Sequence, residues 1–127
     1  MKLEHIAVNV SDPVAASRWY TEHLGLEIVR AATTAPFAHF LSDGAGGVIE
    51  IYNNPNGAVP EYQEMNPFTL HFAFISMGLE DDLERLYGAG ATKVGEIDTT
   101  PAGDRLVFLR DPWGVPLQLV ERAQPLV

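Results

Sequence analysis

Two stretches of the chain, residues 2–10 and 68–76, alternate between large apolar side chains and polar or small ones. In the first stretch the large apolar residues are Ile6, Val8 and Val10, and His5, Ala7 and Asn9 lie between them. A period of two residues is typical of a β-strand with one buried face. We therefore predict a strand over each stretch, with its larger apolar side chains packed beneath a helix.

The first predicted strand is followed by the signals of a helix. Ser11 or Asp12 can cap the N-terminus of this helix, and Pro13 suits its first turn. Gly25 suits the left-handed position that follows a helix C-terminus. Beyond this helix, three short strands are predicted at residues 26–31, 36–42 and 47–52.

The second predicted strand is also followed by a helix and three short strands. Leu79, Leu83 and Leu86 recur at intervals of four and three residues, which gives a helix over residues 79–89 with one buried face. Gly88 or Gly90 is expected to end this helix. Three further strands are predicted at residues 92–97, 104–109 and 115–121.

The sequence itself repeats in step with these elements. Residues 3–8 recur as residues 69–74, an offset of 66 (69 − 3), and residues 40–46 recur as residues 108–114, an offset of 68 (108 − 40). We therefore predict one α+β domain over residues 1–127, made of two tandem β-α-β-β-β units. The units cover about residues 1–57 and 67–127, and a turn-rich linker covers residues 58–66.

The repeat places four polar residues on corresponding strand faces. Because side chains alternate along a strand, His5, Glu50, His71 and Gln118 all point away from the apolar faces. His71 follows His5 by 66 residues (71 − 5), and Gln118 follows Glu50 by 68 (118 − 50). Two imidazoles and a carboxylate are the ligand set of an open divalent-metal site, and they suit Zn, Ni, Co, Mn or Fe better than Ca or Mg.

Composition excludes several classes of partner and chemistry. The chain has 17 acidic and 8 basic residues, a net charge of −9, and no cysteine. This charge argues against binding to nucleic acid or to an anionic membrane. The lack of cysteine excludes disulfides, thiolate metal sites and a cysteine nucleophile. The charged N-terminus is not that of a signal peptide and no long apolar stretch follows, so we expect a cytoplasmic protein.

The repeated units, the histidines at 5 and 71, residues 19–26 (WYTEHLGL) and residues 111–114 (DPWG) resemble the vicinal oxygen chelate superfamily. Its members include glyoxalase I, methylmalonyl-CoA epimerase, fosfomycin-resistance proteins, extradiol dioxygenases and bleomycin-resistance proteins. The resemblance covers nearly the whole chain. It implies that the mixed sheets of the two units curl around a central cleft that holds one divalent metal.

The resemblance also implies roles for individual residues. His5, Glu50 and His71 match the first three metal-ligand positions of the glyoxalase pattern, and Gln118 stands at the fourth, where Glu is usual. Glu121 lies three residues beyond Gln118, an odd step that sends it to the other face of the strand. Glu50 is then the best available proton acceptor.

Three further residues are predicted to contact substrate, and two departures from the pattern bear on which substrate that is. Asn9 and Tyr52 share the ligand faces of their strands, and Asn54 matches an asparagine of the family. Where the glutathione-binding pattern of the family has arginines, this chain has Asn9 and Pro67. The resemblance therefore argues against a glutathione conjugate as the substrate.

We expect a lyase or isomerase that transfers a proton on a small oxygenated substrate. An extradiol-type dioxygenase and a non-catalytic, bleomycin-resistance-like binding protein are the alternatives. Members of this length commonly form homodimers, so a homodimer is expected, with metal ligands from one chain or from two.

Overall fold

The computed structural model describes residues 1–127, and the chain divides into two compact units, Met1–Pro60 and Glu61–Val127. The boundary between the units falls inside the predicted linker. Each unit is described by itself.

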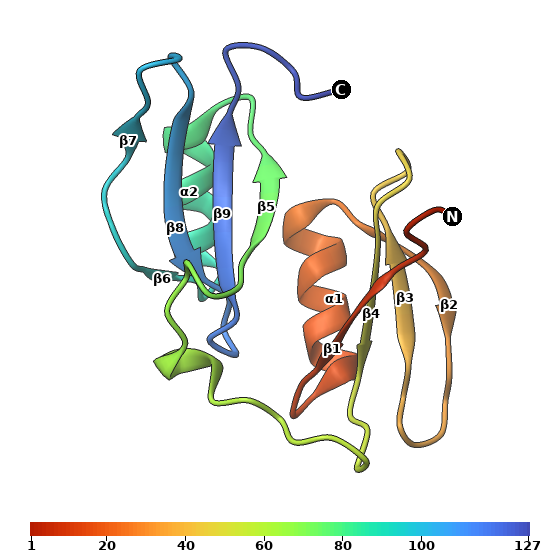
Figure 1. The fold of residues 1–127 in the computed structure, drawn as a ribbon. Helices are drawn as coiled ribbons and strands as arrows, with labels where there is room; N and C mark the ends of the chain where they lie inside the picture. The colour runs from red at the N-terminus through yellow and green to blue at the C-terminus, as the bar shows by residue number, and fades with distance from the viewer. The chain divides into compact units, whose positions relative to one another are not determined.

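The first unit is a mixed four-stranded sheet with one helix (Figure 1). Its elements are β1 (Ile6–Asn9), α1 (Pro13–Leu24), β2 (Glu27–Ala31), β3 (His39–Ser42) and β4 (Val48–Tyr52). The strand order is β1-β4-β3-β2, with β1 parallel to β4 and the other pairs antiparallel. The core of this unit includes Val8, Val10, Tyr20, Leu41 and Ile51.

The second unit repeats this topology (Figure 1). Its elements are a short 3₁₀ helix η1 (Tyr62–Glu64), β5 (Phe72–Ile75), α2 (Leu79–Gly88), β6 (Thr92–Lys93), β7 (Asp98–Thr99), β8 (Arg105–Arg110) and β9 (Pro116–Glu121). The strand order is β5-β9-β8-β6, with β5 parallel to β9, and β7 also pairs with β8. The predicted α+β class with two mixed sheets is therefore confirmed.

The helix boundaries follow the local signals in the sequence. Of the two N-cap candidates for α1, the structure uses Asp12, whose side chain accepts a hydrogen bond from the Ala15 N–H at 3.0 Å. Gly25 ends α1 in the left-handed conformation with φ of 74°. In α2, Leu79, Leu83 and Leu86 are all buried, as their spacing predicts. The last residue of α2 is Gly88, one of the two glycines expected to end it, and Ala89 is its C-cap.

One strand prediction for the second unit needs correction. Of the strand predicted at residues 92–97, only β6 at residues 92–93 forms, and β7 follows just beyond the predicted range at residues 98–99. These two short strands pair with opposite ends of β8. Gly95 lies in the segment between them, and Lys93 forms an ion pair with Glu96 across it at 2.5 Å. Glycine is a poor strand residue, and residues 94–97 are outside the hydrogen-bond ladder.

The first strand of each unit is also shorter than predicted, since β1 begins at Ile6 and β5 at Phe72. His5 and His71 therefore lie immediately before their strands.

The alternation predicts that Gln118 and Val120 face away from the apolar core, yet both are buried, as are Leu117 and Leu119. Strand β9 is thus enclosed on both faces. Neither helix is both long and apolar enough to cross a bilayer.

Candidate functional site

His5 and Glu50 come together in the first unit. The Nε2 atom of His5 lies 3.2 Å from a carboxylate oxygen of Glu50. Strands β1 and β4 run parallel with Ala7 opposite Glu50, so the residue two positions before Ala7 shares the face of the carboxylate. The two side chains retain 32% and 14% of their exposure, so both are partly open to solvent. This is the shared face that the alternation predicts.

Two further contacts hold the His5 ring. The carboxylate of Glu4 contacts Nδ1, and the ring of Phe40 meets the imidazole edge-on, with 5.5 Å between centroids. The carboxylate of Glu4 first, and that of Glu50 to a lesser degree, raise the pKa of the His5 imidazole above its usual value because both stabilise its charged form. Neither Glu4 nor Phe40 is a candidate from the strand pattern.

The second unit contains a matching arrangement. His71 meets the ring of Phe108 edge-on, with 5.1 Å between centroids, and its Nδ1 lies 2.8 Å from the carbonyl oxygen of Pro67. Gln118 is paired with Ala73 on one side and Phe108 on the other. In the first unit, Glu50 is likewise paired with Ala7 and with Phe40.

The repeat therefore extends from the fold to the candidate ligands. Each unit places one histidine, one phenylalanine and one Glu or Gln at equivalent positions. The phenylalanines stand at equivalent places in the repeated segments 40–46 and 108–114, so the repeat is the signal that could have identified them. Neither unit alone contains a group of three or more His, Asp or Glu side chains that could hold a metal ion. Of the predicted ligands, His5 and Glu50 lie in the first unit, and His71 and Gln118 lie in the second.

The predicted substrate contact Asn9 has a structural role. Its amide group donates hydrogen bonds to the carbonyl oxygens of Asn54 at 3.0 Å and Gly57 at 2.9 Å. Its side-chain oxygen accepts a hydrogen bond from the Asn54 N–H at 2.7 Å. The Asn54 side chain, in turn, accepts a hydrogen bond from the Asn56 N–H at 3.0 Å. Both asparagines shape the turn after β4, while half-buried Tyr52 is the partner of Asn9 across the β1–β4 pair.

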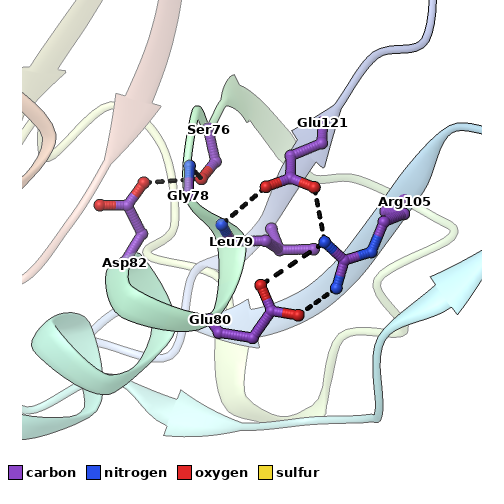
Figure 2. A network of polar contacts seen from close by, with 7 residues as sticks. All are labelled: Ser76, Gly78, Leu79, Glu80, Asp82, Arg105 and Glu121. Atoms are coloured by element: carbon purple, nitrogen blue, oxygen red, sulfur yellow. Dashed lines mark hydrogen bonds and ion pairs between the residues drawn. The ribbon is translucent and has the colours of Figure 1, made fainter.

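Glu121 belongs to a polar network at the start of α2, shown in Figure 2. One of its oxygens accepts a hydrogen bond from the Leu79 N–H at 2.9 Å. The other pairs with the Arg105 guanidinium at 2.7 Å, and Arg105 also contacts Glu80. The Glu121 side chain therefore lies on the α2 side of β9. This is the face opposite to Gln118, as the separation of three residues between them predicts.

The remaining histidines lie apart from this arrangement. His39 is buried, with Nδ1 2.6 Å from the carbonyl oxygen of Phe37. His23 is in the last turn of α1, and its ring contacts that of Trp19 with 5.4 Å between centroids.

The second unit also contains an apolar groove of about 600 Å³ that sequence patterns do not indicate. Ala73, Ile75 and Val120 line it, together with the C-terminal residues Pro125, Leu126 and Val127. Val120 lies two positions beyond Gln118, so it shares the strand face of Gln118. The lining also includes Phe74 and Glu121 from the opposite strand face, and neither His71 nor Gln118 belongs to it.

Solved structures with the same fold cover nearly the whole chain. A glyoxalase family protein from Enterococcus faecalis is 27% identical, with a TM-score of 0.69 over 94% of this chain and 97% of its own. TnmS3, an antibiotic binding protein from Streptomyces sp. CB03234, is 21% identical, with a TM-score of 0.71 over 97% of each chain. A glyoxalase family protein from Bacillus cereus is 16% identical, with a TM-score of 0.79 over 95% of this chain and 93% of its own. The last two similarities concern the fold alone.

Sequence comparison identifies the family. No curated protein matches the sequence. The family model of the Glyoxalase/Bleomycin resistance protein/Dioxygenase superfamily, however, matches residues 2–119, which is nearly the full length. Together with the repeated β-α-β-β-β units, this match shows that the chain belongs to the Glyoxalase/Bleomycin resistance protein/Dioxygenase superfamily.

Proposed function

We infer that the chain is a metal-dependent enzyme of the glyoxalase type, which transfers a proton on a small oxygenated substrate. The observation that carries this proposal is the approach of His5 Nε2 to the Glu50 carboxylate at 3.2 Å, at positions that the second unit repeats with His71 and Gln118. Chance placement on a solvated surface does not account for a repeat of both residues at equivalent positions.

The donor set fits a divalent transition metal. It comprises two imidazole nitrogens, a carboxylate and a carboxamide oxygen, from His5, Glu50, His71 and Gln118, with both units contributing. The Pro67 carbonyl contacts Nδ1 of His71, which directs the Nε2 atom of that ring to any ligand. Zn, Ni, Co, Mn and Fe are all compatible with these donors, and one metal would be bound per set.

A bound divalent metal would supply positive charge that stabilises the negative charge developing on a substrate oxygen. The proton transfer itself falls to Glu50. Its carboxylate is partly exposed and lies 3.2 Å from Nε2 of His5. Gln118 cannot exchange a proton near neutral pH. Glu50 would therefore both accept the proton from one substrate carbon and return it to the neighbouring atom.

The apolar groove suggests what the rest of the substrate is like. A groove of about 600 Å³ is within the usual range for small-molecule sites, and Val120 in its lining shares the strand face of Gln118. It would receive an apolar group of the substrate. Asn9 and Pro67 stand where cationic side chains would be needed for a glutathione conjugate, so we propose a smaller and less anionic substrate.

Metal analysis of the protein purified without chelator tests the proposal. We expect one divalent metal ion per ligand set, recovered by titration after chelation. A chain that neither retains nor takes up a divalent metal would contradict the enzymatic function. Isomerase activity under Zn or Ni would support proton transfer, whereas oxygen consumption with catechols under Fe would identify a dioxygenase instead.

Binding without catalysis is the second candidate function, favoured by the apolar groove in the second unit. TnmS3, which shares the fold, is an antibiotic binding protein. The acidic character of the chain, with a net charge of −9, suits a cationic ligand. Tight binding of an apolar cation by a metal-free protein would favour this candidate over the enzyme.

A further inference from the structure

We propose that the apolar groove of the second unit is a binding site for an uncharged apolar group, such as an aryl or a branched alkyl group. The groove lies entirely within the second unit, so the binding of such a group to it does not require a metal. Only the identification of this group as part of a substrate rests on the proposed function.

Most of the side chains that line the groove are apolar, and several of them are open to solvent. Ile75 at the end of β5 keeps 77% of its exposure, Met77 just beyond it keeps 94%, and Leu126 keeps 78%. Val120 is buried and is paired with Ile75 in the parallel β5–β9 ladder. Exposed apolar side chains that gather around one groove are stabilised when a ligand removes them from water.

Three side chains of the lining are polar, and two of them belong to the network around the start of α2. Figure 2 shows that Ser76 and Glu121 point toward partners in this network. The Ser76 hydroxyl donates a hydrogen bond to Asp82 at 2.6 Å. The two oxygens of Glu121 accept hydrogen bonds from the Leu79 N–H at 2.9 Å and from Arg105 at 2.7 Å. Both polar groups are therefore bound by the protein itself.

The third polar side chain, Arg122, forms an ion pair with Asp104 at 2.8 Å. The Ala123 N–H also donates a hydrogen bond to this carboxylate, at 2.9 Å. This backbone hydrogen bond first, and Arg122 second, lower the pKa of Asp104, so the ion pair persists at neutral pH. The same contacts hold the start of the segment that leaves β9 (Figure 1) and ends in residues 125–127, which line the groove.

The pairing of these side chains decides the charge of the ligand. A charged group in the groove would lose hydration without gaining a counter-charge from a lining side chain, because those charges already have partners. An uncharged apolar group has no such cost, and it buries the exposed apolar surface. The net charge of −9 belongs to the whole chain and attracts cations to its surface, but salt screens this attraction.

Two probes with the same ring system test this preference: 2-naphthylmethanol, which is uncharged, and (2-naphthylmethyl)trimethylammonium, which has a fixed positive charge. Each is titrated in high salt into the full chain, with and without zinc. The methyl NMR signals of Ile75, Met77 and Val120 report where the probe binds. Ile75→Ser shortens one apolar side chain of the lining. Val29→Ser is the control, since Val29 is an exposed apolar residue of β2 in the first unit.

We expect the uncharged probe to shift these three methyl signals and to bind at least about tenfold more tightly than the cation. Ile75→Ser should weaken the binding of the uncharged probe by about tenfold, because part of the apolar contact is lost. Val29→Ser should leave the affinity unchanged. The presence of zinc should not be needed for any of these results.

Three results would overturn the proposal: methyl signals that do not move, a cation that binds as tightly as the uncharged probe in high salt, or an Ile75→Ser variant with normal affinity. A dimer that dissociates in Ile75→Ser, in a chain that binds no probe, would instead assign the groove to a second copy of the chain. If the wild type binds the uncharged probe in the groove but takes up no divalent metal, the proposed function fails and the binding site stands.

Discussion

Glu121 caps α2 from a neighbouring strand, since one of its carboxylate oxygens accepts a hydrogen bond from the Leu79 N–H at 2.9 Å (Figure 2). The N-cap residue of this helix is Gly78, which has no side chain to fill that role. Arg105 holds the second oxygen at 2.7 Å and so fixes the carboxylate in place. A helix N-terminus left without such a partner exposes unpaired N–H groups.

Replacing this carboxylate should therefore affect stability and leave metal binding unchanged. We expect Glu121→Ala to lower the free energy of unfolding by about 1–2 kcal/mol, because one helix cap and one ion pair are lost. Urea unfolding measures this change, and zinc titration of the same variant should match the wild type. A loss of zinc binding at unchanged stability would instead assign Glu121 as a ligand.

Strand alternation predicted part of this division of roles. It placed His5 and Glu50 on one face, and it sent Glu121 to the other face from Gln118 because the two are separated by an odd number of residues. These conclusions need only the period of a strand and the repeat, which are local properties of the sequence. The N-cap Asp12 and the C-cap Gly25 of α1 could likewise be predicted from the neighbouring residues alone.

What the sequence did not indicate depends on contacts between distant segments. Asn9 reaches the backbone 45 residues away at Asn54, and the guanidinium of Arg110 donates to the carbonyl oxygens of Tyr62 and Met65, both at 2.8 Å. A side chain bound to a distant main-chain carbonyl leaves no periodic signal. The early end of the strand predicted at residues 92–97, which forms only at residues 92–93, was missed because a single glycine is a weak indicator of a strand break.

The two histidines should contribute to metal binding to a similar extent. We expect His5→Ala and His71→Ala each to weaken zinc binding by more than about 100-fold, because a ligand lost outright costs more than a supporting partner. His23→Ala removes one imidazole at the end of α1 and serves as the control, with affinity unchanged. Full zinc affinity in either ligand variant, measured by calorimetry, would contradict the assigned set.

Gln118 offers a test of how the two half-sites differ. We expect Gln118→Glu to bind zinc more tightly than the wild type, because a carboxylate replaces a neutral carboxamide at a position equivalent to Glu50. The added negative charge should also steepen the pH dependence of zinc binding, since the new carboxyl group must lose its proton first. Weaker zinc binding in this variant than in the wild type would show that residue 118 does not face the metal.

Asn9 should behave as a structural residue. We expect Asn9→Ala to lower the free energy of unfolding by about 1–3 kcal/mol, because the carbonyl groups of Asn54 and Gly57 and the Asn54 N–H lose their partner. Amide hydrogen exchange should accelerate at Asn54 and at its neighbours in the turn. Unchanged exchange and stability, combined with weaker substrate binding, would instead support the role in substrate contact that the sequence predicts.

The hydrogen bond between Ser76 and Asp82 should make stability depend on pH in the acid range. The Ser76 hydroxyl donates to Asp82 at 2.6 Å and, with the adjacent Arg85, holds the pKa of that carboxyl below its usual value of 3.8. A carboxyl group with a lowered pKa in the folded state stabilises the fold at pH values above its unfolded pKa. That stabilisation is lost as pH falls through the folded pKa, where the native carboxylate becomes protonated.

Ser76→Ala should therefore destabilise the protein by about 1 kcal/mol at pH 7. The difference from the wild type should narrow as the pH is lowered below about 4, once the Asp82 carboxylate no longer accepts this hydrogen bond. Urea unfolding at a series of pH values measures both quantities. Asp82→Asn, which carries no titratable group, is the control: in this background, Ser76→Ala should give a difference that does not change with pH. If the destabilisation by Ser76→Ala were also independent of pH in the background that retains Asp82, the effect of Ser76 would be assigned to its other contact. In that contact the Ser76 hydroxyl accepts a hydrogen bond from the Gly78 N–H at 3.2 Å.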